Sequence, residues 1–207
     1  KIFFLFVLLV HSNLPLALCI SSEPIIYVSG NENGNFTCDG IDDHIQINEA
    51  LELVAGNSSY TTVYLKGPFT YLINDTLLIG NNTTLEGDSD AKVKLVNNAN
   101  WEVSKPLIRE RNYNSQNITI KGFTIDGNRE GNTNVVSGKG YYNLIHLSYC
   151  QNISVCNMYL TNNHGDGLKT DRCSDIKLHD NRIYSLGHDC LYAITSSEVE
   201  AYNNTIS

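Results

Sequence analysis

Carboxylate and imidazole side chains that can transfer protons gather at two points of the chain, 23 residues apart. Asp166 and Asp189 are separated by that interval, and His188 directly precedes the second aspartate. Neighbouring carboxylates disfavour joint ionisation, so one pKa should rise toward the range of a general acid. A pair of carboxylates around a glycosidic bond is the usual apparatus for its hydrolysis. We therefore expect Asp166, Asp189 and His188 to be catalytic without a metal ion, although Asp beside Gly is also a common turn former.

The same interval aligns further polar side chains. His146, Lys169 and Tyr192 follow one another at steps of 23 residues, and Ser148 and Asp171 come two residues after the first two. Alternate residues of a strand point to one face, so both sets should lie on the outer face of one sheet. Lys169 would bind a uronate carboxylate and Tyr192 would stack on a sugar ring. The predicted substrate-binding residues are His146, His164, Lys169, Asp171 and Tyr192.

A repeated unit explains this interval. The segment NISV at residues 152–155 recurs as DIKL at 175–178 and as EVEA at 198–201, and NITI precedes it by 35 residues. The excess of 12 residues fits an inserted loop at about 129–140. Short apolar triplets at this period fit an all-β fold, a right-handed single-stranded parallel β-helix whose equivalent residues stack about 4.8 Å apart. A leucine-rich solenoid has a similar period, but no Leu-x-x-Leu-x-Leu frame repeats here.

The open end of such a solenoid needs a cover, because its edge would otherwise pair with other chains. Residues 42–55 fit an amphipathic capping helix that Asp42 or Asp43 can cap and that Gly56 ends. The apolar residues near helical spacing are Ile45, Ile47, Leu51 and Val54. Residues 62–65 (TVYL) predict the first strand, so we expect the coils from about residue 60.

The N-terminus has the pattern of a secretory signal peptide, with Lys1, an apolar run and a small residue at Ala17. The run is too short to span a bilayer, so no membrane span is expected once it is removed. We expect residues 1–20 to be the signal peptide and 21–207 to be the N-terminal part of a β-helix domain that continues past the last repeat. Eight Asn-x-Ser/Thr triplets agree with a secreted or cell-surface glycoprotein.

Charge and composition narrow the expected partners. With 14 Lys+Arg against 22 Asp+Glu, the chain has a net charge of -8, which argues against binding nucleic acid or anionic membranes. The 26 Asn and 15 Gly favour turns, where Asn side chains can stack their amides between coils. The expected partner is an extracellular polysaccharide, and no cofactor is required for its hydrolysis. Cys150 and Cys173 occupy equivalent positions in two coils and could form a disulfide.

Two segments resemble consecutive motifs of the polygalacturonase family. NHGDGL at residues 163–168 is similar to Asn-Thr-Asp-Gly-Ile, and LGHDCLYAI at 186–194 is similar to Gly-Asp-Asp-Cys-Ile-Ala-Ile. That family has the same β-helix fold and uses three Asp residues to hydrolyse glycosidic bonds with inversion of configuration. Asp166 matches the first of them and Asp189 the last, whereas His188 stands where the family has its general acid. The resemblance implies that His188 or another group protonates the leaving oxygen.

A second resemblance concerns the N-terminal half. CDGIDDHIQINEAL at residues 38–51 looks like the start of pectate-lyase-type β-helices, in which an Asp-Gly-x-x-Asp-Asp run precedes a capping helix. Together with the segments at 63–71, 76–80 and 85–88, it is similar to the disaggregatases of methanogenic archaea. Those are secreted β-helix proteins that break down a uronate-containing matrix polysaccharide. This resemblance implies a secreted depolymerase and transfers no catalytic residue.

Three functions stay open at this point. Hydrolysis is favoured, with Asp189 and Asp166 positioning and activating water and His188 donating the proton. A lyase would instead need a base at the uronate C5, Lys169 or Arg172, and a cation for the carboxylate. That cation could be Ca²⁺ held by Asp166, Asp171 and Asp189. The third function is carbohydrate binding without turnover, in a groove lined by Tyr141, Tyr142, His146 and Tyr192.

Overall fold

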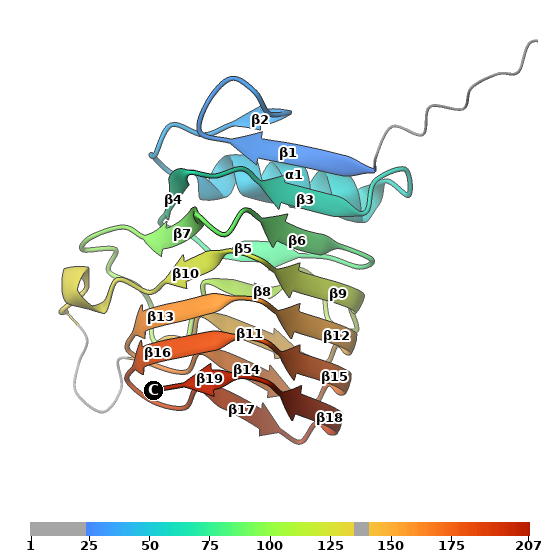
Figure 1. The fold of residues 1–207 in the computed structure, drawn as a ribbon, viewed down its shortest axis with the longest axis vertical. Helices are drawn as coiled ribbons and strands as arrows, with labels where there is room; N and C mark the ends of the chain where they lie inside the picture. Colours follow the sequence, from blue (N-terminus) through green and yellow to red (C-terminus); the bar gives the residue numbers. More distant parts are fainter. Residues whose placement is uncertain (1–23, 135–140) are drawn as a thin grey trace, which may run out of the picture.

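The chain winds into coils whose short strands form three parallel sheets (Figure 1). The structure is a computed structural model that describes residues 24–134 and 141–207. Sheets A, B and C have the strand orders β18-β15-β12-β9-β6-β3-β1-β2, β19-β16-β13-β10-β7-β4 and β17-β14-β11-β8-β5. Successive coils pair strand by strand in parallel, which confirms the predicted parallel β-helix.

The strands are short and follow the chain from sheet A to sheet B to sheet C. Sheet A holds β1 (Ile25–Ser29), β2 (Phe36–Thr37), β3 (Thr62–Leu65), β6 (Thr84–Gly87), β9 (Gln116–Lys121), β12 (Gln151–Cys156), β15 (Ser174–His179) and β18 (Ser197–Tyr202). Sheet B holds β4 (Phe69–Ile73), β7 (Ala91–Leu95), β10 (Thr124–Asp126), β13 (Tyr159–Asn163), β16 (Arg182–Leu186) and β19 (Thr205–Ile206). Sheet C holds β5 (Leu77–Ile79), β8 (Ile108–Glu110), β11 (Ile145–Ser148), β14 (Leu168–Asp171) and β17 (Leu191–Ile194).

The register of the strands confirms the 23-residue repeat. Ile153 pairs with Ile176, which pairs in turn with Val199, and Ile118 pairs with Ile153 from the preceding coil. The first three of these side chains along the chain are fully or almost fully buried. Apolar side chains thus stack in ladders inside the coils, and burying them removes apolar surface from water.

Asparagine side chains link the coils as predicted. Asn117 Nδ2 donates to Asn82 Oδ1 at 2.6 Å, and Asn152 Nδ2 donates to Asn117 Oδ1 at 2.7 Å. At the corner between sheets A and B, Asn157, Asp180 and Asn203 adopt left-handed backbone conformations with φ of 55, 57 and 55°. Asn and Asp tolerate this conformation better than other non-glycine residues. The Asn excess therefore reflects coil architecture.

The capping helix α1 (His44–Gly56) covers the N-terminal end of the coils and contacts β5, β1 and β3 (Figure 1). Its buried residues include Ile47, Leu51 and Val54, but the prediction was wrong for Ile45, which is 47% exposed. The Asp43 side chain makes no capping bond to the helix. Its Oδ1 instead accepts bonds from the backbone N–H groups of Asp39 and Gly40, and its Oδ2 accepts one from Leu72, because the carboxylate is fully buried between these segments.

Three further predictions concern the first strand, the inserted loop and the N-terminal segment. The first strand is not β3 but β1, which precedes the helix and pairs with β3 in parallel, so sheet A begins before residue 60. The insertion contains the short 3₁₀ helix η1 (Arg129–Gly131), and residues 135–140 lie outside the described part. The predicted signal peptide, residues 1–20, also lies outside it. No helix among the described residues is long and apolar enough to cross a membrane.

The two stacked cysteines carry free thiols. Cys150 and Cys173 lie buried on adjacent coils, and the backbone N–H of Cys150 donates to Cys173 Sγ at 3.3 Å. The possible disulfide between them is therefore not formed in this structure.

Candidate active site

The turns that lead from sheet B into sheet C place the predicted catalytic residues on neighbouring coils. Asp166 lies just before β14, and His188 and Asp189 lie just before β17. The backbone N–H of Asp166 donates to Asn143 Oδ1 at 3.0 Å, and the N–H of Asp189 donates to Asp166 Oδ1 at 3.1 Å. These bonds show that Asn143, Asp166 and Asp189 stack on successive coils, and they fix the Asp166 carboxylate between two coils.

His188 is held between the two carboxylates. Its Nδ1 lies 2.6 Å from Asp166 Oδ1 and 3.4 Å from Asp189 Oδ2. The hydrogen bond to Asp166 raises the pKa of His188 above its ordinary value, because the carboxylate favours the charged imidazolium. Tyr141 stacks on the ring almost in parallel, with 5.2 Å between centroids. The site therefore holds the imidazole in a fixed orientation, with a raised pKa that favours its charged form.

Burial separates the roles of the two aspartates. The Asp166 side chain is 2% exposed, whereas those of His188 and Asp189 are 49% and 53% exposed. A substrate can reach the imidazole and the Asp189 carboxylate, but not the Asp166 carboxylate beneath them. The buried Asp166 carboxylate therefore lies where it orients His188, and the predicted role of Asp166 in activating water has no direct support from this geometry.

The three side chains also form a possible cation-binding group. One ligand atom from each of Asp166, His188 and Asp189 lies within 4.8 Å of the others. Ca²⁺ takes six to eight oxygen ligands, so a set with one imidazole and a buried carboxylate fits it poorly. Asp171, the third residue of the predicted Ca²⁺ set, pairs instead with Arg172 Nη1 at 2.8 Å.

The predicted outward row on sheet C is present. Register pairing aligns His146 with Lys169, and Lys169 with Tyr192, on β11, β14 and β17. Lys169 Nζ lies 5.4 Å from the centroid of the Tyr192 ring. Arg109 on β8 extends this row, because it pairs with His146. Sequence reasoning missed Arg109, since the insertion places it 37 residues before His146 rather than 23.

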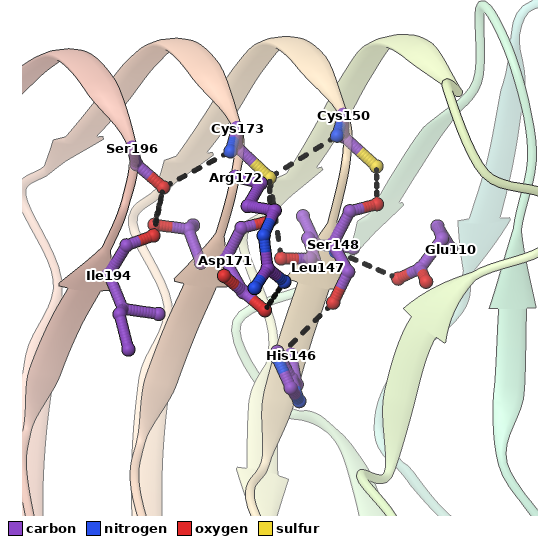
Figure 2. Close-up of polar contacts among 11 residues, drawn as sticks. Glu110, His146, Leu147, Ser148, Cys150, Asp171, Arg172, Cys173, Ile194 and Ser196 are labelled. Carbon is purple, nitrogen blue, oxygen red and sulfur yellow. Dashed lines mark hydrogen bonds and ion pairs between the residues drawn. The ribbon is translucent and has the colours of Figure 1, made fainter.

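A cleft of about 390 Å³ opens beside this row. Its lining residues include Arg109, Glu110, His146, Ser148, Asp171 and Arg172. Figure 2 shows His146 reaching toward Ser148, with 3.3 Å between Nε2 and the hydroxyl. Burial lowers the pKa of His146, and the nearby Lys169 lowers it further. The pKa values of two histidines of one face are therefore shifted in opposite directions: that of His188 is raised and that of His146 is lowered.

Glu110 is a second residue that sequence reasoning missed. It takes an inward position on β8, where it pairs with Ile79 of the preceding coil, and it is buried. Its Oε2 accepts the backbone N–H of Ser148 at 3.1 Å (Figure 2). Burial raises the pKa of Glu110. A charged residue within an otherwise apolar alternating pattern was the available signal.

His164 lies apart from the His188 cluster. Its Nε2 is 2.8 Å from the Asn132 carbonyl oxygen, in the segment after η1, and its ring meets Tyr142 edge-on at 5.7 Å. His164 therefore anchors the inserted segment to the coil. Its predicted role in substrate binding has no direct support from these contacts.

A family model described as rhamnogalacturonase A/epimerase, pectate lyase-like matches residues 35–207. The chain belongs to this family. Membership identifies it as a carbohydrate-active β-helix protein and confirms the predicted pectate-lyase-type fold. The resemblance to the archaeal disaggregatases stays a prediction.

Solved structures share the fold of this family member. A predicted glycosyl hydrolase from Parabacteroides merdae superposes with a TM-score of 0.55 at 13% identity, over 78% of this chain and 87% of that one. The A-modules of the mannuronan C-5 epimerases AlgE4 and AlgE6 from Azotobacter vinelandii give 0.54 and 0.51 at 18% and 19% identity, over 86% and 80% of this chain. The chain spans 58% and 53% of those two modules. At such identities the likeness shows the fold alone. No curated protein sequence matches the chain.

Proposed function

We propose that the protein is a secreted depolymerase that hydrolyses glycosidic bonds in a uronate-containing polysaccharide. The observation that carries the proposal is the exposed His188 imidazole, bonded to buried Asp166 and flanked by exposed Asp189. The imidazolium donates a proton to the leaving glycosidic oxygen, and the Asp189 carboxylate activates the attacking water. Asp166 keeps the imidazole oriented and charged until the proton is transferred.

The charged row on sheet C supports the substrate class. Arg109, His146 and Lys169 stand on consecutive strands, about 4.8 Å apart by the spacing of parallel strands. A polysaccharide lying along the coil axis would bring successive sugar carboxylates past the two permanent cations. Tyr192 adds an aromatic face beside Lys169. The same proposal includes a secreted or cell-surface location. It also includes an archaeal matrix polysaccharide as the substrate, as the disaggregatase resemblance implies.

A lyase on the same scaffold is the second candidate. The observation that favours it is Lys169, which stands between His146 and Tyr192 in the row along which the polysaccharide would lie. Lys169 or Arg172 would then abstract the C5 proton, and Ca²⁺ would be an added requirement. Carbohydrate binding without turnover is the third candidate.

Incubating the full chain with polygalacturonate, alginate and chondroitin separates these candidates. Hydrolysis releases reducing ends without the absorbance of unsaturated uronate, whereas a lyase produces both. His188→Gln should lower the rate at least about a hundredfold, as expected for loss of a general acid. His179→Gln is the matched control, since His179 also pairs with an aspartate, on sheet A. Equal effects of both variants, or unsaturated products, would overturn the hydrolytic proposal.

A further inference from the structure

The corner between sheets C and A has an unusual backbone. Tyr149, Arg172 and Thr195 occupy equivalent positions on three coils, with φ of 55, 53 and 50°. The corner between sheets A and B has the same left-handed conformation, but its residues are Asn, Asp and Asn. Left-handed backbone is unfavourable for residues with large or β-branched side chains. The C–A corner therefore carries conformational strain that the A–B corner avoids, and such strain concentrates at functional sites.

The strained corner displays an aromatic and cationic surface. The Arg172 guanidinium lies 5.2 Å from the centroid of the Tyr149 ring. Tyr113 meets Tyr149 edge-on at 5.4 Å and is itself 72% exposed. We call these three residues, Tyr113, Tyr149 and Arg172, the corner patch.

The corner patch separates two hollows. The cleft of about 390 Å³ on the sheet C side and a second one of about 240 Å³ on the sheet A side are both lined by Tyr149 and Arg172. The second hollow is also lined by Cys150 and by four side chains that can bond sugar hydroxyl groups, namely Asn114, Gln116, Gln151 and Ser174. Exposed aromatic faces together with amide groups and a guanidinium suit a charged sugar.

Arg172 is available to a new carboxylate. Its only ion pair among the described residues is with Asp171 Oδ2 at 2.8 Å, and Figure 2 shows both side chains on the His146 side of the corner. The Arg172 side chain is half exposed, so solvent screens this pair and the pair contributes little to stability. A guanidinium has five N–H donors and can bind a carboxylate through two of them. A uronate can therefore join Arg172 or displace Asp171 from it.

We propose that the corner patch is a non-catalytic binding site for uronate-bearing polysaccharide, separate from the His188 cluster. Tyr113 and Tyr149 pack against sugar rings, and Arg172 binds a carboxylate of the chain as it leaves the sheet C cleft. The substrate class rests on the proposed function, but binding at this corner does not require turnover.

Asparagine substitutions test the site without adding backbone strain. Tyr149→Asn and Arg172→Asn remove the ring and the guanidinium, while Asn suits the left-handed conformation. Thr195→Asn is the matched control, because it also introduces Asn at a left-handed position of this corner, but outside the corner patch. All three are made in a His188→Gln chain, so that the polymer stays intact, and melting temperatures check the fold. Binding is measured by affinity electrophoresis in polygalacturonate, in dextran sulfate, which is anionic but carries no uronate, and in dextran.

The expected result is at least a fivefold weaker retardation by polygalacturonate for Tyr149→Asn and Arg172→Asn, at about 1 kcal/mol per lost contact. Thr195→Asn should bind like its parent, and dextran should retard none of the chains. Undiminished binding by the two corner-patch variants, or equal loss with Thr195→Asn, would overturn the proposal. If the sulfated polymer retards the parent chain equally and the two corner-patch variants weaken that retardation equally, the uronate assignment would be overturned. Because binding is read without turnover, a failed hydrolytic proposal would leave this test intact.

Discussion

Two histidines of the molecule make nearly the same contacts on different sheets. His188, before β17, lies 2.6 Å from an Asp166 carboxylate oxygen and stacks on Tyr141. His179, at the end of β15, lies 2.7 Å from an Asp180 oxygen and stacks on Tyr202, with 4.8 Å between centroids. Judged by the pair and the stacked ring alone, either histidine could be the proton donor.

The difference lies in the carboxylate. Asp166 comes from the neighbouring coil and is 2% exposed, whereas Asp180 is the next residue in sequence and is 43% exposed. A buried carboxylate cannot exchange its partner for water without a large penalty, whereas an exposed one can. The His188 ring is also the more exposed of the two and has Asp189 beside it. A buried orienting carboxylate under an accessible imidazole therefore distinguishes the candidate catalytic pair from a surface pair.

Replacing each carboxylate by an amide in turn tests whether the two histidines differ in function. Asp166→Asn should lower depolymerisation of polyuronate about 10²- to 10³-fold, because the amide cannot stabilise the imidazolium. Asp180→Asn should leave the rate within about twofold, since exposed pairs contribute little. Reducing-end assays on both purified variants provide the measurement. Similar rates for the two variants would remove the distinction drawn between the two histidines.

The raised pKa of His188 predicts how activity depends on pH. Its pKa is raised by Asp166, so the imidazolium persists above the ordinary value of about 6.5. Activity that needs this proton should fall as pH rises through the raised pKa, and Asp166→Asn should move that fall to lower pH. The associated stabilisation of the fold is present at low pH and is lost over the same rise.

Proton NMR titration of the imidazole C–H signals provides the measurement. Assignment comes from His188→Gln and His179→Gln. A His188 signal that titrates at or below the ordinary value, or that ignores Asp166→Asn, would contradict the prediction.

The smallest expected effect concerns His146, whose pKa is lowered by burial and by Lys169 against the opposing influence of Asp171 and Asp166. The unfolded chain binds this proton at higher pH than the native state does. Stability should therefore decrease as pH falls through about 6.5 toward the lowered native value. His146→Gln should flatten this slope, measured as urea midpoints across that window. An unchanged slope would show that His146 is not kept neutral by its surroundings.

Sequence reasoning could predict the coils because their physical basis is periodic. Strand alternation sends Ile153 and Ile176 inward and His146 and Lys169 outward, and the constant repeat aligns equivalent residues between coils. The same reasoning placed Asp166, His188 and Asp189 together, since all three follow from one step of the repeat. It failed at Arg109 and β1, where an insertion and the helix interrupt the period.

The residue pattern alone therefore predicts the solenoid, the register of its later coils and the face on which charged groups gather, because each depends on local alternation and a constant repeat. The tertiary structure decided what each group can do. It buried Asp166 beneath His188, turned His164 toward Asn132, and placed Glu110 in an apolar row. Burial and the choice of hydrogen-bond partner arise from side chains of different coils meeting in space, which no repeat period specifies.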